Sequence, residues 1–249
     1  MKIIAIVLLV IAVAIATAVA FLPASLVDGR IASATAGKVR LADAAGTVWD
    51  GRGVLTDAAG TWRLPLGWSI SKADVLRGNR VVALHPVDGA ASPSGSVEVV
   101  DGGLRLHDLR IDVPAQALFA SLPMRPLPAF GGVVAVTASD LSWSGAAKAG
   151  TVQARWQGAR VASADSVVDL GTVDLAAAPQ ESGVAGKLTN TGGDVRVDGT
   201  VSVAGSNVAI DATVAPNPGA PANIARALAA VGTPDANGNV RIGWRGSVR

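Results

Sequence analysis

The residues Ser69-Ile70-Ser71-Lys72 form a stretch whose types and spacing could support chemistry. In acyl-transfer enzymes the pattern Ser-x-x-Lys supplies a serine nucleophile and a nearby lysine, which must share one face of a helix. Here the stretch continues an alternating strand pattern, and residues three apart on a strand point to opposite faces. The chain also lacks a Lys-Thr-Gly motif, so we interpret the match as coincidental.

Histidine and cysteine limit the remaining chemistry. His85 and His107 are the only histidines, and a zinc site would need both of them together with a carboxylate. The carboxylates nearest in sequence are Asp88, Asp101 and Asp108, and nothing in their spacing indicates such a site. The absence of cysteine excludes a thiol nucleophile and a thiolate-bound metal. We therefore predict a protein that is not an enzyme, with no catalytic, metal-binding or cofactor-binding residues.

The charge and length of the chain narrow the class of partner. Half of the 249 residues are apolar, the net charge is +2, and lysines and arginines are scattered singly along the chain. Nucleic-acid-binding proteins cluster these residues on one face or in one segment. The composition therefore argues against a nucleic-acid partner, and the length suits one large domain or two small ones.

An apolar run occupies the N-terminal part of the sequence. Residues 3–22 are all apolar except Thr17, and Lys2 precedes them. At about 1.5 Å per residue this run spans roughly 30 Å, the thickness of the hydrocarbon core of a bilayer. We expect residues 1–22 to form an uncleaved transmembrane anchor with its positive end in the cytoplasm. The alternative is a signal peptide cleaved near Ala18-Val19-Ala20, and both interpretations place the following domain outside the cytoplasm.

After this run, apolar residues recur with the period of two that is typical of strands. The clearest segment is 62–70, where the apolar positions are Trp62, Leu64, Leu66, Trp68 and Ile70. Strict alternation predicts a strand with one buried face. Pro65 has no amide hydrogen, so we expect this strand at an edge of the sheet or with an outward-facing amide at that residue. Trp62, Leu64, Leu66 and Ile70 are our candidate surface for a partner or a lipid.

Further segments extend the strand pattern and add two helices. Alternating apolar positions are Val195, Val197, Val201 and Val203, then Val208, Ile210, Ala212 and Val214, then Val240, Ile242 and Trp244. Within residues 104–113 the alternation slips by one residue at His107-Asp108, which predicts a β-bulge. Residues 114–122 and 222–231 are predicted as short helices.

The order of these elements predicts the fold class. A strand, a short helix, a strand led by glycine and a Trp-x-Gly sequence follow one another twice, which indicates a weak internal duplication. We predict a mostly β protein, in which the transmembrane helix is followed by an antiparallel β-sheet domain. This domain would consist of two similar halves, residues 23–145 and 146–249, each with one short helix.

The sequence Val48-Trp49-Asp50-Gly51 is interpreted as a strand end that enters a tight turn. We expect Trp49 to cover the sheet, Asp50 to turn the backbone, and Gly51 to adopt a conformation that other residues disfavour. Tryptophan beside or near glycine recurs at Trp68, Trp143, Trp156 and Trp244. This recurrence indicates an architectural role, so we class Val48, Trp49, Asp50, Gly51 and Trp68 as structural.

Several of these segments together resemble the type II secretion system protein N family. They are the apolar N-terminal run, VWDGR at residues 48–52, LPLGWSI at 64–70, GSVEVVDGGLRLHDLRIDVPAQAL at 95–118, and the closing G-x-V-R-I-G-W-R-G at 238–246. The resemblance covers nearly the whole chain, and Val-Trp-x-Gly followed by a tryptophan-bearing strand is its most specific motif.

This resemblance implies an accessory component of the type II secretion apparatus in the inner membrane of a Gram-negative bacterium. Its bulk would lie in the periplasm and would bind other components, such as the platform proteins lettered C, L and M or the secretin. The family offers no catalytic residue to carry over. It is similar in architecture to AsmA-like proteins, whose curved sheets hold lipid on an apolar inner face. An AsmA-like periplasmic groove that binds or transfers phospholipid is therefore the alternative function.

Overall fold

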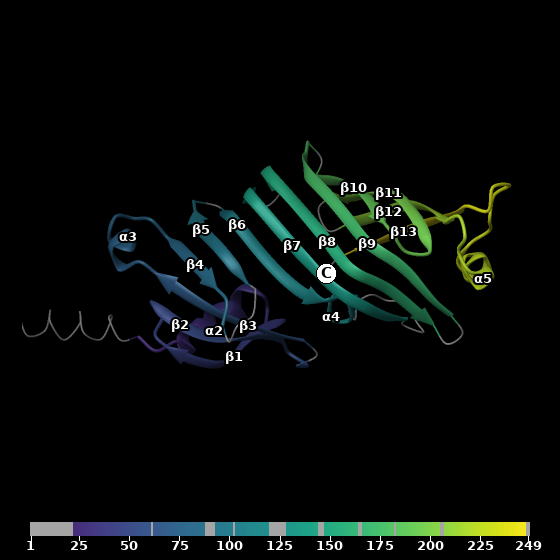
Figure 1. Cartoon of the computed structure of the whole chain (residues 1–249). Helices are drawn as coiled ribbons and strands as arrows, with labels where there is room; N and C mark the ends of the chain where they lie inside the picture. Colours follow the sequence, from purple (N-terminus) through teal and green to yellow (C-terminus); the bar gives the residue numbers. More distant parts are fainter. Residues whose placement is uncertain are drawn as a thin grey trace, which may run out of the picture. The chain divides into compact units, whose positions relative to one another are not determined.

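The computed structural model shows a protein built almost entirely from antiparallel strands (Figure 1). It describes residues 22–60, 62–87, 93–101, 103–119, 128–143, 147–163, 166–181, 183–204 and 207–247. The sheet has 13 strands, and they follow one another in chain order from β1 to β13. The mostly β, antiparallel class predicted from the sequence is therefore confirmed.

The chain divides into two compact units, Met1–Glu98 and Val99–Arg249. The elements of the first unit are α2 (Ser25–Ala34), β1 (Val39–Gly46), β2 (Asp50–Asp57), β3 (Arg63–Ile70), α3 (Lys72–Leu76) and β4 (Val81–His85), and β5 (Ser94–Val100) contains the division. The second unit contains β6 (Gly103–Pro114), α4 (Ala115–Phe119), β7 (Ala129–Trp143), β8 (Ala147–Ser163), β9 (Ser166–Gln180), β10 (Gly183–Thr191), β11 (Val195–Ala204), β12 (Asn207–Pro216), α5 (Ala222–Val231) and β13 (Val240–Ser247).

In the first unit, helix α2 packs on the face of the sheet that the alternation in β3 predicts to be buried. The core consists of Ala24, Leu41, Leu66 and Trp68, and Val27 and Ile31 of α2 pack against it together with Leu55, Ile70, Val82 and Leu84. Residues two apart on β3 therefore point to the same core, as a period of two requires. Trp68 is the largest of these side chains and is only 3% exposed.

In the second unit, helix α5 covers one end of the apolar face of the sheet. Ile224 and Leu228, one helical turn apart, pack with Val195, Val197, Ala212, Val214 and Val240. Helix α4 lies elsewhere along the same unit, where Phe119 packs on Phe130 and Trp156 with ring centroids 4.6 and 5.3 Å away. The indole Nε1 of Trp156 donates a hydrogen bond to the carbonyl of Gly131 at 2.8 Å.

The apolar alternation does slip at His107-Asp108, but the β-bulge predicted there is wrong, because β6 and β7 keep the same register on both sides of these residues. The pairing of β6 with β7 is interrupted between Leu106–Leu141 and Leu109–Ala138. Asp108 has a φ of 45° in this gap, a left-handed conformation that reverses the alternation locally. Leu106 and Leu109 consequently contact the same small core around Ala138 and Leu141, although they are three positions apart and would point to opposite faces of a regular strand.

The edge position predicted for residues 62–70 is wrong, because β3 lies between β2 and β4. The other arrangement expected at Pro65, with the position of its missing amide hydrogen facing away from a partner strand, agrees with the strand pairing. Pro65 pairs with Val54 of β2, whereas β4 pairs with β3 only from Gly67 to Ile70 among the described residues. The proline therefore lies on the part of β3 that β4 does not reach.

The helices differ in part from those predicted. Helix α5 begins and ends at the predicted residues, Ala222 and Val231. Helix α4 begins at Ala115, one residue after the predicted start, because Pro114 still belongs to β6. It is described as far as Phe119, and residues 120–122 of the predicted helix lie outside the described residues. Helices α2 and α3 were not predicted.

The anchor predicted over residues 1–22 lies outside the described residues except for Leu22. Within the described ranges, no helix has the length and apolar character that crossing a bilayer requires. The two similar halves are not confirmed, since the units meet at Glu98 and Val99, whereas the predicted boundary followed residue 145.

Candidate functional site

The residues that could have supported catalysis lie on different elements. Ser69 is in β3, whereas Lys72 begins α3, where its Nζ lies 5.7 Å from the ring centroid of Trp49. His85 is opposite Gly67 in the first unit. His107 is in the second unit, with its Nδ1 3.0 Å from Oδ1 of Asp140. In the part of the chain that the structure describes, no cluster of three or more histidine and acidic residues could hold a metal ion.

The VWDG stretch and Trp68 form one structural unit. Val48 and Trp49 connect β1 to β2, Asp50 begins β2, and Gly51 pairs with Trp68 of β3. The indole Nε1 of Trp68 donates a hydrogen bond to the carbonyl of Val48 at 3.0 Å. Its ring lies directly over Gly51, where a Cβ would stand 2.5 Å from the Cζ2 atom. The buried tryptophan therefore occupies the space that a side chain at Gly51 would need.

This geometry corrects two details of the sequence interpretation. Gly51 is not among the residues with positive φ, so space rather than backbone conformation requires glycine there. The glycine that does turn the backbone is Gly46, with a φ of 91°. Trp49 is only half-buried, and the residue that covers the sheet most fully is Trp68.

The same turn holds the start of the described chain. The amide of Val48 donates to the carbonyl of Leu22 at 2.9 Å, and the amide of Ala24 donates to the carbonyl of Gly46 at 3.1 Å. Pro23 and Thr47 form an isolated bridge between these two bonds. The segment that follows the apolar N-terminal run is thus joined directly to the VWDG turn, without an intervening linker.

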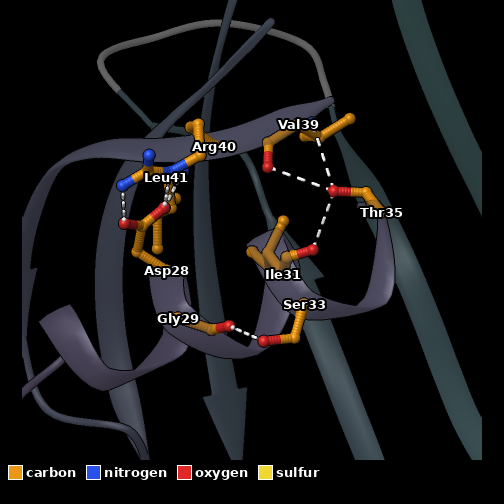
Figure 2. A network of polar contacts seen from close by, with 8 residues as sticks. All are labelled: Asp28, Gly29, Ile31, Ser33, Thr35, Val39, Arg40 and Leu41. Carbon is orange, nitrogen blue, oxygen red and sulfur yellow. Dashed lines mark hydrogen bonds and ion pairs between the residues drawn. The ribbon is translucent and has the colours of Figure 1, made fainter. Parts of the chain in front are cut away.

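Helix α2 closes the outer edge of β1 with side chains (Figure 2). Oδ1 of Asp28 accepts a hydrogen bond from the amide of Leu41 at 2.8 Å. Oγ1 of Thr35 accepts one from the amide of Val39 at 3.1 Å. Further along β1, the pairing with β2 shifts between Ala42 and Ala45. Backbone amides that a strand edge usually leaves for another strand are therefore occupied or distorted here.

The carboxylate of Asp28 has a lowered pKa in this network. Its carboxylate accepts from Nε and Nη2 of Arg40 at 2.9 and 2.6 Å. The hydrogen bonds from Arg40 and from the Leu41 amide lower the pKa of Asp28 from 3.8 to about 2. The carboxylate is therefore ionised at neutral pH, and it links α2 to β1.

The candidate surface on β3 is covered to different degrees along its length. Leu66 is buried in the first core at 6% exposure, and Ile70 packs against that core. Leu64 and Trp62 are half-buried near the beginning of the strand. Among the described large apolar side chains of this unit, Leu76 of α3 is the most accessible at 89% exposure, followed by Leu26 of α2 at 50% and Val75 of α3 at 37%.

The second unit has a shallow hollow of about 660 Å³. Its lining comes from residues 151–153 of β8, 176–178 of β9, 185–187 of β10 and 198–202 of β11. Alanine, glycine, serine and threonine predominate among these residues, with Val152 and Val201 as the larger aliphatic ones. The lining also includes Lys187 and Asp198, whose charged groups are 3.5 Å apart.

Sequence reasoning missed the closure of β1 by α2. The contributing residues, Asp28 and Thr35, are separated from their strand partners by 13 and 4 residues. A helix start with Asp28 in its first turn was the available signal, but the neighbouring apolar run obscured it.

Comparison with known proteins identifies one family. The model of a family described as type II secretion system (T2SS), protein N matches residues 37–243. No curated protein and no solved structure gave a significant match. The matched region begins two residues before β1 and ends within β13.

Proposed function

Because the chain belongs to the type II secretion system protein N family, we propose that it supports secretion by binding other components of that system and not by catalysis. The observation that carries this proposal is the family match over residues 37–243, which reaches from before β1 into β13. The platform proteins lettered C, L and M and the secretin are the proposed partners.

We propose further that residues 1–22 anchor the protein in the inner membrane as a single pass, with its bulk in the periplasm. The apolar run in the sequence supports this location. The hydrogen bonds of Leu22 and Ala24 to the VWDG turn support a fixed exit point, since they would hold the anchor against the first unit.

The absence of cysteine makes this location directly testable. Ala58 is exposed between β2 and β3, so an Ala58→Cys variant carries a single accessible thiol. We expect a membrane-impermeant maleimide to label it in cells with a permeabilised outer membrane. We also expect alkaline carbonate to leave the protein in the membrane pellet. Labelling only after lysis of the inner membrane would contradict the periplasmic location.

Helix α3 offers a contact for a partner. Leu76 and Val75 are adjacent and exposed there, and it is contiguous exposed apolar surface that marks protein-binding sites. We expect Leu76→Asp to reduce both secretion and co-purification with platform components, without changing the melting temperature. Ala73→Asp is the matched control, because it places the same charge on an exposed position of the same helix. Equal effects of the two variants would remove α3 from the proposed contact.

The AsmA-like alternative is favoured by the size of the hollow over β8–β11, which is about 660 Å³ and is in the range of small-molecule sites. Small residues dominate its described lining, which includes Val152 and Val201 but neither Leu nor Trp, whereas acyl chains would favour a lining of Val, Leu and Trp. Native mass spectrometry of the purified protein, with parallel organic extraction, separates the two functions. Stoichiometric phospholipid would support the groove, and a lipid-free mass would support the binding module.

A further inference from the structure

Strand β13 lies at the opposite end of the strand order from β1. Among the described residues it is hydrogen-bonded along its length to β12 alone, without a register shift, from Val214–Val240 to Asn207–Ser247. Antiparallel geometry directs the N–H and C=O groups of alternate residues away from that partner. Pro234 bridges to Val240 on the outer side, so the open part of the edge begins at residue 241.

The two ends of the sheet differ in how their edges are treated. At β1, Asp28 and Thr35 occupy outward amides, and the pairing is distorted after Ala42. At β13, no side chain in the described part of the chain is hydrogen-bonded to a backbone amide of residues 241–247. A long, regular edge of this kind is a template for pairing with another strand.

The side chains of β13 determine which side chains a strand that pairs with it must carry. Arg241 and Arg245 are exposed and share one face, whereas Ile242 and Trp244 are half-buried on the other. Arg241 is bound to Asp211 by two hydrogen bonds of 2.9 and 2.6 Å. The hydrogen bonds from Arg241 lower the pKa of the Asp211 carboxyl, and the positive charge of Arg245 lowers it further. One carboxylate thus serves two guanidinium groups, and the edge keeps an excess of positive charge.

We propose that β13 is a site of strand addition, where an extended segment of another secretion component pairs antiparallel with residues 241–247. Carboxylates of that segment lie opposite Arg241 and Arg245, and apolar side chains lie opposite Ile242 and Trp244. The recognised sequence is therefore acidic–apolar–x–apolar–acidic. Main-chain hydrogen bonds supply affinity in this mode, and the side chains opposite supply specificity. The inference rests on the proposed function for the class of partner.

A second copy of the chain fits this edge less well. Head-to-tail addition would need the β1 edge, which Asp28 and Thr35 close. Pairing of two β13 strands centred on Gly243 would set Arg241 of one copy opposite Arg245 of the other. Like charges directly opposite each other destabilise a strand pair. The charges on β13 therefore favour an acidic partner over self-association.

The test uses the full-length protein in detergent and a labelled synthetic peptide, Ser-Asp-Val-Thr-Val-Asp-Ser. We expect fluorescence anisotropy to show saturable binding, and hydrogen exchange to slow at β13 but not at β1. A peptide with lysine in place of both aspartates should not bind. Arg245→Glu should weaken binding about tenfold, the effect of replacing an attractive cross-strand pair with a repulsive one. Arg196→Glu is the matched control, because Arg196 is exposed on β11, away from the edge.

Three results would overturn the inference. The first is unchanged exchange at β13 in a protein that remains folded by circular dichroism. The second is binding that Arg245→Glu does not weaken. The third is hydrogen exchange at β13 that is already slow in the absence of peptide and becomes slower as the protein concentration rises. That result would mean that a second copy of the chain pairs with this edge. If the protein still co-purifies with secretion components after any of these results, the proposed function stands and the strand-addition site alone fails.

Discussion

The indole of Trp68 joins two separate parts of the VWDG stretch. Its Nε1 bonds the carbonyl of Val48 at 3.0 Å, and its ring fills the space over Gly51 in the neighbouring strand. Val48 in turn holds Leu22 through its amide. One buried side chain therefore supports the β1–β2 turn, the register of β2 against β3, and the attachment of the N-terminal segment.

Gly51→Ala should destabilise the first unit because the new Cβ meets the Trp68 ring and the carbonyl of Thr47, at 2.5 and 2.7 Å. We expect a loss of about 1–3 kcal/mol in the free energy of unfolding, as for other overpacked sites, measured by urea denaturation. Gly29→Ala is the control, since a Cβ at this position in α2 has no atom within 4 Å. It should be neutral or slightly stabilising, because alanine favours a helix more than glycine does.

Trp68→Ala should cost about 3–5 kcal/mol, the usual range for removing a buried aromatic side chain. Trp49→Ala should cost clearly less, because Trp49 is half-buried and its ring faces the Lys72 ammonium. Chemical denaturation of both variants tests this order. Equal losses would show that Trp49 contributes to the core as fully as Trp68 does.

The stability that Asp28 contributes should depend on pH in one direction. Its pKa is lowered in the folded protein from 3.8 to about 2, so the contribution is complete above about pH 4 and is lost as pH falls toward 2. We expect Asp28→Asn to melt below the wild type by a constant margin between pH 5 and 7. That margin should shrink below pH 4, as the wild-type carboxylate becomes protonated. A margin independent of pH would show that the charge of Asp28 is not what stabilises α2 on β1.

Thr35→Val should open one position of the β1 edge without changing side-chain volume greatly. The Val39 amide loses its acceptor, so its hydrogen exchange should accelerate by about fivefold, corresponding to a bond worth about 1 kcal/mol. Ser33→Ala is the control, because the Ser33 hydroxyl bonds the carbonyl of Gly29 within the helix. Exchange at Val39 that is insensitive to Thr35→Val would mean that another group protects this amide.

Ile224→Ala should destabilise the second unit by about 2–5 kcal/mol, since Ile224 is 1% exposed among the valines beneath α5. Arg226→Ala, at an exposed position of the same helix, should change stability by less than about 0.5 kcal/mol. Thermal unfolding followed by circular dichroism compares the two variants. Similar melting temperatures would indicate that α5 is not held by this core.

The sequence predicted well those features that follow from burial of one face. Strands β11, β12 and β13 alternate because their apolar residues face α5 and the core beneath it. The stripe of Ile224 and Leu228 predicted α5 for the same reason. The irregularity at Asp108 was visible because a residue with positive φ shifts the phase of every apolar residue after it.

Features that depend on contacts between residues far apart in the sequence could not be predicted from it. The need for glycine at position 51 arises from Trp68 in another strand, so the residue type was noticed but its reason was misassigned. Helix α2 carries Gly29 at its centre and lacks a side-chain cap at its N-terminus, so Asp28 in its first turn was the one local signal, and it was too weak to predict the helix. Its role at the edge depends on the placement of Asp28 beside Leu41, which only the folded chain brings about.

The hydrogen bonds of Asp28 and Thr35 to β1 also limit how far copies of this protein can assemble. A filament grows by strand pairing only if every subunit offers both a donor and an acceptor edge. Here two amides of one edge, those of Val39 and Leu41, are already hydrogen-bonded to side chains of the same subunit. Growth would stop after a single addition, so complexes built through this sheet would have a fixed, small stoichiometry even where the protein is crowded.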